Sequence, residues 1–196
     1  MIGPASSGPS VNAQYILRKL QIPQIGYSAS TPALSDDTLF PYFVRTPPSD
    51  AIQAVVLAGV IKSFGWDQVA TISGTDTYSY TGVQSFQAAA MRAGITVAGS
   101  QTFTAGSKNV TREVSNLLSG GTRIVAVFTR ASDMGTVVRE FNRHNMWKRD
   151  TGVVYLFSDV IKVGGEWKAC LLGGGGIRCS RACTAVVTVL LCGVLV

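Results

Sequence analysis

Residues 66–103, WDQVATISGTDTYSYTGVQSFQAAAMRAGITVAGSQTF, decide the fold of this chain. The stretch opens on an apolar run at 66–73 that is typical of a strand, and it closes on a second such run at 95–103. Between them, residues 80–94 place apolar side chains at helical spacing, and Gly94 is positioned to end the helix. The residues expected to face inward are Val83, Phe86 and Ala90. A strand, a helix and a strand at this spacing predict a unit of a parallel sheet.

A second helix is expected just upstream, over residues 49–65. Asp50 and Gln53 have the spacing of a capping box, and Gly65 is placed to stop the helix. Apolar residues recur at helical spacing along it and predict the buried face: Ile52, Val55, Val56 and Val60.

The alternation continues downstream of the opening stretch. A helix is expected at 107–121, with Val110, Val114, Leu117 and Leu118 on one side, and another at 132–145, with Met134, Val137, Val138 and Phe141. Strands are expected at 123–129, a continuous apolar run typical of burial on both faces, and at 152–159. The chain is therefore predicted to be an α/β protein with a doubly wound parallel sheet.

The N-terminal part adds a helix at 7–21, with Val11, Tyr15 and Leu20 near one face, and a strand at 22–29. A hydroxyl-rich loop follows, and residues 41–45, PYFVR, resemble a further strand. A polar loop between two buried segments is compatible with a surface connection and equally with one wall of a small-molecule site.

The composition is that of a globular protein with a core, since hydrophobic residues make up 46% of the chain and charged residues 14%. The net charge of +6 is unevenly placed: residues 1–160 hold 13 basic and 10 acidic side chains, and residues 161–196 hold 4 and 1. The globular part is thus close to neutral and carries no basic run, which argues against nucleic acid as a partner.

The last part of the chain differs from the rest. All four cysteines lie at or after Cys170, without a partner pair or a histidine at zinc spacing, so neither a metal nor a cofactor is expected. Residues 164–196 show no periodicity and are interpreted as foreign to the α/β body. Their apolar end, residues 182–196, is short for a membrane span of about 20 residues. A truncated span, a buried strand and a spurious chain end all remain open, and the start MIGPASSGPS lacks a signal-peptide pattern.

Several polar residues are expected at the carboxyl ends of strands or at helix starts, where open α/β sheets bind ligands. Ser6, Ser7 and Gly8 precede a helix and suit a carboxylate or phosphate, although an N-cap serine is the more ordinary interpretation. Ser28 and Ser30 follow a strand and suit an anion or a turn. Asp50, Tyr78 and Asp159 are the remaining candidates, for which capping, loop packing and solvation are the alternatives.

Catalytic patterns are scarce: the sequence has no nucleophile elbow, no P-loop and no His-Glu-x-x-His motif. The only histidine, His144, has no evident partner, so the chain is not expected to be an enzyme. Asn109-Val110-Thr111 matches the N-glycosylation pattern, which has meaning only outside the cell.

Residues 3–54 strongly resemble the ligand-binding region of class C G-protein-coupled receptors, of the metabotropic glutamate and GABA-B type. The resemblance rests on IPQI, YSAS, LSDDT and PSD, and GWDQVATI, the Tyr78 loop and FSD extend it to about residue 160. That region is a Venus flytrap module with a type 1 periplasmic-binding-protein fold. The resemblance implies residues 1–44 as part of lobe 1, 45–163 as lobe 2 and 164–196 as a non-homologous tail.

The resemblance also implies roles for single residues. Ser7 and Ser30 match the residues that hold a ligand's α-carboxylate, with Ser28 beside them. The residues that match those around the ligand's ammonium group are Asp50, Tyr78 and Asp159. An aromatic face such as that of Tyr78 adds a cation–π contact of about 0.5–2 kcal/mol. Acids at positions 50 and 159 favour an α-amino acid over GABA.

The functional expectation is a fragment of a dimeric membrane receptor that binds an amino-acid-like ligand between two lobes on the extracellular side. A G protein would be reached only through regions that this chain lacks. Because much of lobe 1 is missing, we expect weak or no ligand binding by the chain alone. A soluble amino-acid-binding protein of a transporter is the alternative, and a doubly wound enzyme is a third.

Overall fold

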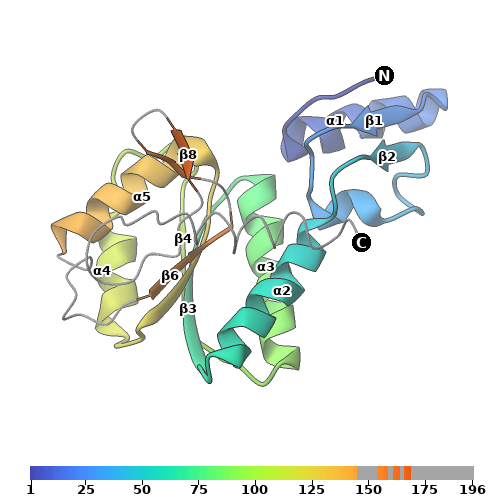
Figure 1. Cartoon of the computed structure of the whole chain (residues 1–196). Helices are drawn as coiled ribbons and strands as arrows, with labels where there is room; N and C mark the ends of the chain where they lie inside the picture. Colours follow the sequence, from blue (N-terminus) through green and yellow to red (C-terminus); the bar gives the residue numbers. More distant parts are fainter. Residues whose placement is uncertain (145–153, 159–160, 164–165, 169–196) are drawn as a thin grey trace.

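A computed structural model describes residues 1–144, 154–158, 161–163 and 166–168 (Figure 1). Two parts can be distinguished. The N-terminal segment, residues 1–45, has a small sheet of its own, and the sheet body, residues 50–144 and 154–158, is built on a larger one. The chain is therefore an α/β protein with parallel sheets, as the alternating pattern predicts.

The sheet body contains four parallel strands in the order β4-β3-β5-β6. They are β3 (Gln68–Gly74), β4 (Thr96–Phe103), β5 (Ile124–Phe128) and β6 (Val154–Phe157). All five residues of β5 are buried, as expected for a strand that is covered on both faces. The opening βαβ unit is confirmed, because β3 and β4 pair in parallel along their whole length.

Helices cover both faces of this sheet (Figure 1). On one face lie α2 (Asp50–Ser63) and α3 (Thr77–Arg92), which pack with Val69, Ala126 and Phe128. On the other lie α4 (Thr111–Ser119) and α5 (Ala131–Arg143), which pack with Ile72 and Val127. The doubly wound arrangement predicted from the sequence is confirmed.

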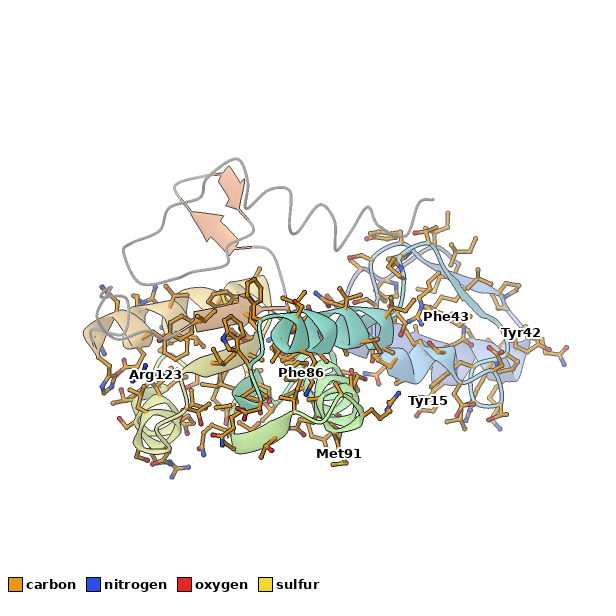
Figure 2. All side chains as sticks on the ribbon, turned by 60° about the horizontal axis from the view of Figure 1, so that its bottom comes forward. Tyr15, Tyr42, Phe43, Phe86, Met91 and Arg123 are labelled. Carbon is orange, nitrogen blue, oxygen red and sulfur yellow. The ribbon has the colours of Figure 1, made fainter. Side chains whose placement is uncertain are left out.

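Helix α3 packs as its periodicity predicts. Val83, Phe86 and Ala90 are buried, and the Phe86 and Phe128 ring centroids lie 5.4 Å apart. Figure 2 labels Phe86 within this layer and Met91 at its outer surface, where Met91 is 78% exposed. Gly94 has a φ of +70°, a left-handed conformation that glycine adopts at little cost after a helix.

Helix α2 packs by a different face from the predicted one. Ile52, Val55 and Val56 are exposed, and the buried residues are Asp50, Ala54, Leu57, Ala58 and Ile61. The helix is apolar almost all round, so periodicity offers two candidate faces. Small residues decide between them, because alanine side chains let α2 approach α3 closely.

The predicted capping box of α2 is also wrong. Ser49 is the N-cap, and its hydroxyl accepts a hydrogen bond from the Ala51 backbone N–H at 3.3 Å. Asp50 is the first helical residue, and the Gln53 side chain points to the end of β6 instead. The predicted stop is confirmed, since the helix ends at Ser63 and Gly65 has a φ of +71°.

The N-terminal segment contains α1 (Ser7–Leu17), η1 (Arg18–Leu20), β1 (Gln24–Gly26), η2 (Pro32–Ser35) and β2 (Phe43–Arg45). The strands β1 and β2 pair in parallel. Ile2 forms an isolated parallel β-bridge to Ile25, so that the start of the chain runs beside β1. Figure 2 labels Tyr15, Tyr42 and Phe43 in this segment.

Helix α1 buries polar residues where apolar ones were expected. Ser7, Ser10 and Gln14 are buried, whereas Tyr15 is 46% exposed and Leu20 is 62% exposed. The reason is a hydrogen-bonded network: the Gln14 amide donates to Gln24 Oε1 at 3.2 Å, and the Gln24 amide donates to the Gly3 carbonyl at 3.0 Å. Of the predicted face, Val11 packs against the small core of Ala29, Leu34 and Phe40, and the Tyr15 ring meets the Phe40 ring edge to face at 5.4 Å between centroids.

Beyond Ser158, the structure describes only β7 (Ile161–Val163) and β8 (Glu166–Lys168), which pair antiparallel. Of the predicted tail at 164–196, all but 166–168 lies outside the described residues. Within the described part of the chain, no helix is both long and apolar enough to cross a membrane.

Candidate functional site

Of the predicted site residues, Asp50 and Tyr78 lie at the edge of the sheet body where β3 and β6 end, and Ser7 and Ser30 approach this edge from the N-terminal segment. The helices α2 and α3 begin at this edge, so their first turns present backbone N–H groups and the positive ends of their dipoles there. In an open parallel sheet, this edge is where ligands bind.

The start of α1 meets the start of α3. Ser7, the first residue of α1, is buried, and a Cβ atom added to Gly8 would lie 3.3 Å from the Thr77 Oγ1 atom. Nearby, the Thr31 and Thr81 hydroxyl oxygens are 2.9 Å apart and share a hydrogen bond. The N-terminal segment therefore contacts the first turns of α3 at the same edge.

Ser30 and Asp50 are bonded directly to each other. The Ser30 hydroxyl donates to Asp50 Oδ2 at 2.9 Å, and the Asp50 backbone N–H donates to the Ser30 carbonyl at the same distance. Two residues predicted for opposite ends of a zwitterion thus form one contact between the N-terminal segment and α2. Asp50 is only 7% exposed, so its carboxylate is largely withdrawn from bulk water.

Arg45 lies beside this contact. Its guanidinium donates to the Thr31 carbonyl at 2.7 Å and to the Ser30 carbonyl at 3.3 Å, and it also contacts the Ser35 hydroxyl. Burial lowers the pKa of Arg45, and the negative charge of Asp50 acts in the opposite direction. Arg45 therefore supplies positive charge to the buried Asp50 while it fixes the hydroxyl-rich loop.

Tyr78 reaches across the edge to the end of β6. Its hydroxyl donates to the Ser158 carbonyl at 3.1 Å and lies 3.4 Å from the Ser158 Oγ atom. The Gln53 amide of α2 donates to the same carbonyl at 2.6 Å. These hydrogen bonds join α2 and α3 to the end of β6. Asp159, the next residue and a predicted site residue, lies outside the described residues.

The other predicted residues are less closely held. Ser28 is exposed in the loop after β1, and Ser6 is the exposed N-cap of α1, without a side-chain capping bond. Asn109 is exposed as well, and its Oδ1 atom accepts from the Thr111 N–H at 3.0 Å in the turn that opens α4. Glycosylation at Asn109 stays a prediction.

Sequence reasoning missed four contributors to this edge: Gln53, Thr77, Arg45 and Ser158. Gln53 and Ser158 are 105 residues apart in the chain, and nothing local marks them as partners. Thr77 and Ser158 do stand next to predicted residues, so a search for polar neighbours of Tyr78 and Asp159 would have found both.

An ion-pair network fixes the neighbouring part of the edge. Asp76 caps α3 and lies 3.6 Å from the Nε atom of Arg130, whose Nη2 atom lies 3.4 Å from Asp133. Arg130 precedes α5, so the network joins the starts of α3 and α5. Among the described residues, no group of histidine, cysteine and acidic side chains could hold a metal ion.

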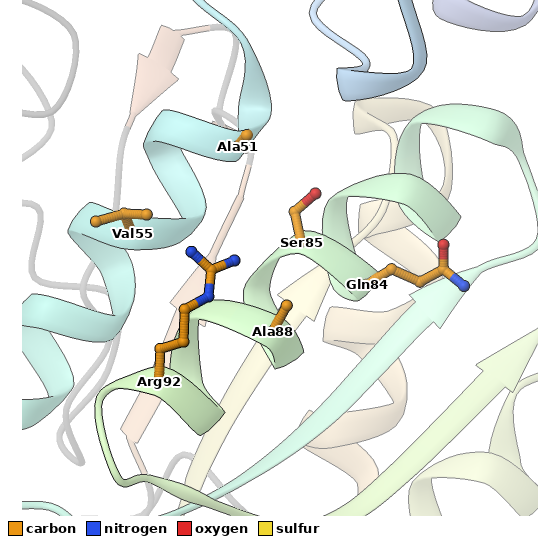
Figure 3. A pocket seen from close by; sticks show the side chains of 6 residues that line it. All are labelled: Ala51, Val55, Gln84, Ser85, Ala88 and Arg92. Carbon is orange, nitrogen blue, oxygen red and sulfur yellow. The ribbon is translucent and has the colours of Figure 1, made fainter. Parts of the chain in front are cut away.

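A groove of about 360 Å³ lies elsewhere, between α2 and α3 (Figure 3). Arg92 extends from α3 toward α2 across it, and the remaining lining residues are Ala51, Val55, Gln84, Ser85 and Ala88. None of the predicted ligand-binding residues that the structure describes lines this groove. The hydrogen-bonded edge, and not the groove, is therefore the candidate site.

The Tyr78 contacts lead to a first prediction. Replacing Tyr78 with phenylalanine removes two hydroxyl contacts to Ser158 and is expected to lower the free energy of unfolding by about 1 kcal/mol. Urea denaturation followed by far-UV circular dichroism measures the change. Tyr80→Phe is the matched control, because Tyr80 is 50% exposed in the same helix turn, and it should have no effect. Equal effects of the two substitutions would contradict the assigned role of the Tyr78 hydroxyl.

Comparison with protein families gives a match over most of the chain. Residues 1–165 match a family model described as receptor family ligand binding region. The match covers the N-terminal segment, the whole sheet body and the start of the hairpin that follows it.

Proposed function

Because this chain belongs to the receptor family whose ligand-binding region matches residues 1–165, we propose that it binds a small amino-acid-like zwitterion. The site is the edge where the starts of α1, α2 and α3 converge. The observation that carries the proposal is the close approach of Gly8, at the start of α1, to Thr77, at the start of α3. This approach brings together the starts of two helices whose residues are about 70 positions apart in the chain.

The ligand carboxylate is assigned to the start of α1. An 11-residue helix presents free N–H groups and a partial positive charge at its first turn, which suits an anion. Ser7 adds a hydroxyl there, and we assign Ser28 and Ser30, in the loop after β1, to the same carboxylate. Gly8, which has no side chain, lets Thr77 of α3 approach the start of α1 closely.

The ammonium group is assigned to Asp50, Tyr78 and Asp159. Asp50 is a buried carboxylate at the start of α2, and a charge in such an environment interacts more strongly than one in water. Tyr78 offers its ring face for a cation–π contact. Asp159 directly follows Ser158, to which Tyr78 is bonded.

Ser30 and Asp50 couple the two halves of the site. Their mutual hydrogen bonds cross from the N-terminal segment to α2, so a ligand that contacts either residue also acts on this junction. We assign residues 1–44 to lobe 1 and 45–163 to lobe 2. Ligand binding would favour the closed arrangement of the lobes, through contacts that only this arrangement makes.

The wider role follows from the resemblance to class C G-protein-coupled receptors. In such a receptor the region lies outside the cell, works as a dimer and passes closure on to a membrane part that couples to a G protein. The family is one of ligand binding and not of catalysis, which agrees with the absence of catalytic motifs in the sequence.

Amide chemical shifts of the ¹⁵N-labelled chain test the proposal. Addition of L-glutamate or glycine is expected to shift the amides of Ser7, Gly8, Thr77 and Tyr78, with dissociation constants of about 1 mM or weaker. GABA should shift them less, because its ammonium and carboxylate groups are farther apart. The amides of α4, on the opposite face of the sheet, serve as the internal control. Shifts confined to α4, or shifts of α4 as large as those at the starts of α1 and α3, would contradict the proposal.

A further inference from the structure

The strand β4 forms one edge of the sheet body. Among the described residues it pairs with β3 on one side, and the strand order β4-β3-β5-β6 leaves its other side open. The register with β3 skips Ala98, so this residue forms a bulge. The regular part of the strand is residues 99–103, which we call the β4 edge.

The β4 edge directs backbone groups away from the sheet. The Phe103 carbonyl accepts a hydrogen bond from the Thr75 N–H, on the side of β3. Successive residues of a strand point their N–H and C=O groups to opposite sides, so those of Ser100 and Thr102 point to the open side. Such a row of backbone donors and acceptors is a template for pairing with another strand.

The side chains along the β4 edge do not prevent pairing. Proteins commonly protect sheet edges with lysine, proline or bulges, but residues 95–104 include no charged residue and no proline. The bulge at Ala98 disturbs only the first part of β4, and residues 99–103 keep a regular register with β3. A neutral strand can therefore approach the β4 edge without repulsion between charges.

The two faces of β4 carry different side chains. Ser100 lies on the α3 side, because its Oγ atom accepts from the Gln87 amide of α3 at 3.1 Å. Side chains alternate along a strand, so Thr102 lies on the same side as Ser100. Gln101 lies on the α4 side together with Phe103, which packs in the core there.

Further strands and a larger lobe 1 would not cover the β4 edge. In chain order the four strands are arranged 2-1-3-4, and the common doubly wound order 2-1-3-4-5 adds its next strand beside the fourth, which is β6. The N-terminal segment meets the sheet body at the starts of α2 and α3. A larger lobe 1 would therefore lie beyond the strand ends and not along the side of β4.

We propose that the β4 edge pairs antiparallel with the β4 edge of a second copy of this chain, about a two-fold axis at Gln101. In this register Ser100 lies opposite Thr102 of the second copy, and the two exchange backbone hydrogen bonds. Their hydroxyls lie on the same face of the sheet and form a cross-strand pair that can share a hydrogen bond. Gln101 lies opposite itself on the other face. The contact does not depend on the ligand site.

The side of the sheet body along β4 is large enough for a stable interface. The eight residues of β4 span about 26 Å at about 3.3 Å per residue. The sheet and the helices α3 and α4, which contact β4 from its two faces (Figure 1), form three layers of about 10 Å each. The side therefore measures about 800 Å², which is the area that each partner buries in a standard interface.

Two other partners fit the β4 edge less well. Peptides that add a strand to a sheet gain specificity from pockets for their side chains. The groove described above is lined by residues of α2 and α3 and by none of β4. The hydrocarbon of a lipid bilayer would leave the backbone groups of the edge unpaired. A second copy supplies a neutral strand of the same length, with hydroxyls that match those of Ser100 and Thr102.

A charge exchange at Gln101 tests the proposal in the full chain. Sedimentation velocity is expected to show a dimer for the unchanged chain. Gln101→Lys and Gln101→Glu each place like charges opposite each other and should each weaken the dimer at least about tenfold. An equimolar mixture of the two variants should restore it, because lysine then faces glutamate. Gln84→Lys is the control and should stay dimeric, since Gln84 is exposed at the groove between α2 and α3.

Disulfide trapping checks the register. With all four cysteines replaced by serine, Gln101→Cys is expected to form a disulfide between two chains under mild oxidation. Facing residues at such a position have Cβ atoms about 4.5–5.5 Å apart, which is close to what a disulfide needs. Gln84→Cys in the same background is the control and should form at least about tenfold less disulfide between chains, because it has no facing thiol.

Three results would overturn the proposal. The first is a chain that stays monomeric, as it would if its own tail or a different protein covered the β4 edge. The second is a dimer that Gln101→Lys and Gln101→Glu leave intact, or that their mixture does not restore. The third is equal disulfide formation at positions 101 and 84.

Discussion

Replacing Asp50 with alanine is expected to abolish the amide shifts caused by L-glutamate and to lower the free energy of unfolding by about 1–3 kcal/mol. Asp50 is 93% buried, since only 7% is exposed, and its carboxylate accepts from the Ser30 hydroxyl. Removing it leaves the Ser30 hydroxyl without this acceptor and deprives the partly buried Arg45 of a nearby negative charge. Urea denaturation and the amide titration measure the two effects separately.

Asp50→Asn separates binding from stability. An asparagine side chain can still accept from Ser30, so most of the stability should remain, but it has no charge for an ammonium group. The ligand shifts should therefore still be lost. Asp67→Asn is the control, because Asp67 is exposed just before β3. Ligand shifts that persist in Asp50→Asn would show that Asp50 holds the junction together without contacting the ligand.

Replacing Ile61 with alanine is expected to lower the free energy of unfolding by about 2–5 kcal/mol. Ile61 is fully buried in α2 and packs in the core that α2 and α3 form with the sheet. The substitution removes three carbon atoms from a closely packed region and leaves a cavity. Urea denaturation, with the same slope for both proteins, gives the difference directly.

Ile52→Ala is the matched control, with the same residue type in the same helix. Ile52 is 46% exposed, so its replacement should change the free energy of unfolding by about 0.5 kcal/mol or less. The periodicity of the sequence favours the reverse order, since it places Ile52 on the buried face. A larger effect at Ile52 than at Ile61 would show that α2 packs by the face predicted from sequence.

The different outcomes for α1, α2 and α3 show what limits such predictions. In α3, Val83, Phe86 and Ala90 stand on one face and the exposed Gln84 and Arg92 on the other, so the buried face follows from the sequence. In α2, apolar residues lie on every side, and the fit of Ala54 and Ala58 to the neighbouring helix decides the orientation. In α1, the hydrogen bonds of Gln14 to a strand ten residues away outweigh the burial of Tyr15.

The candidate site was predictable only in part. Helix starts and strand ends identify Ser7, Asp50 and Tyr78, because an α/β fold brings such positions to one edge. The hydrogen-bond partners of these residues are set by three-dimensional packing and do not follow from the local sequence. The Ser30–Asp50 bond and the approach of Gln53 to Ser158 join segments that are separate in the sequence.

The central claim is that one ligand contacts the N-terminal segment and the sheet body together. Intermolecular nuclear Overhauser effects from ¹³C-labelled L-glutamate, recorded on the whole chain at saturating ligand, test it most directly. The account predicts contacts from the same bound ligand to Ser7 or Gly8 at the start of α1 and to the Tyr78 ring of α3. Contacts to only one of these two parts, or to residues of α4 and α5 alone, would contradict it.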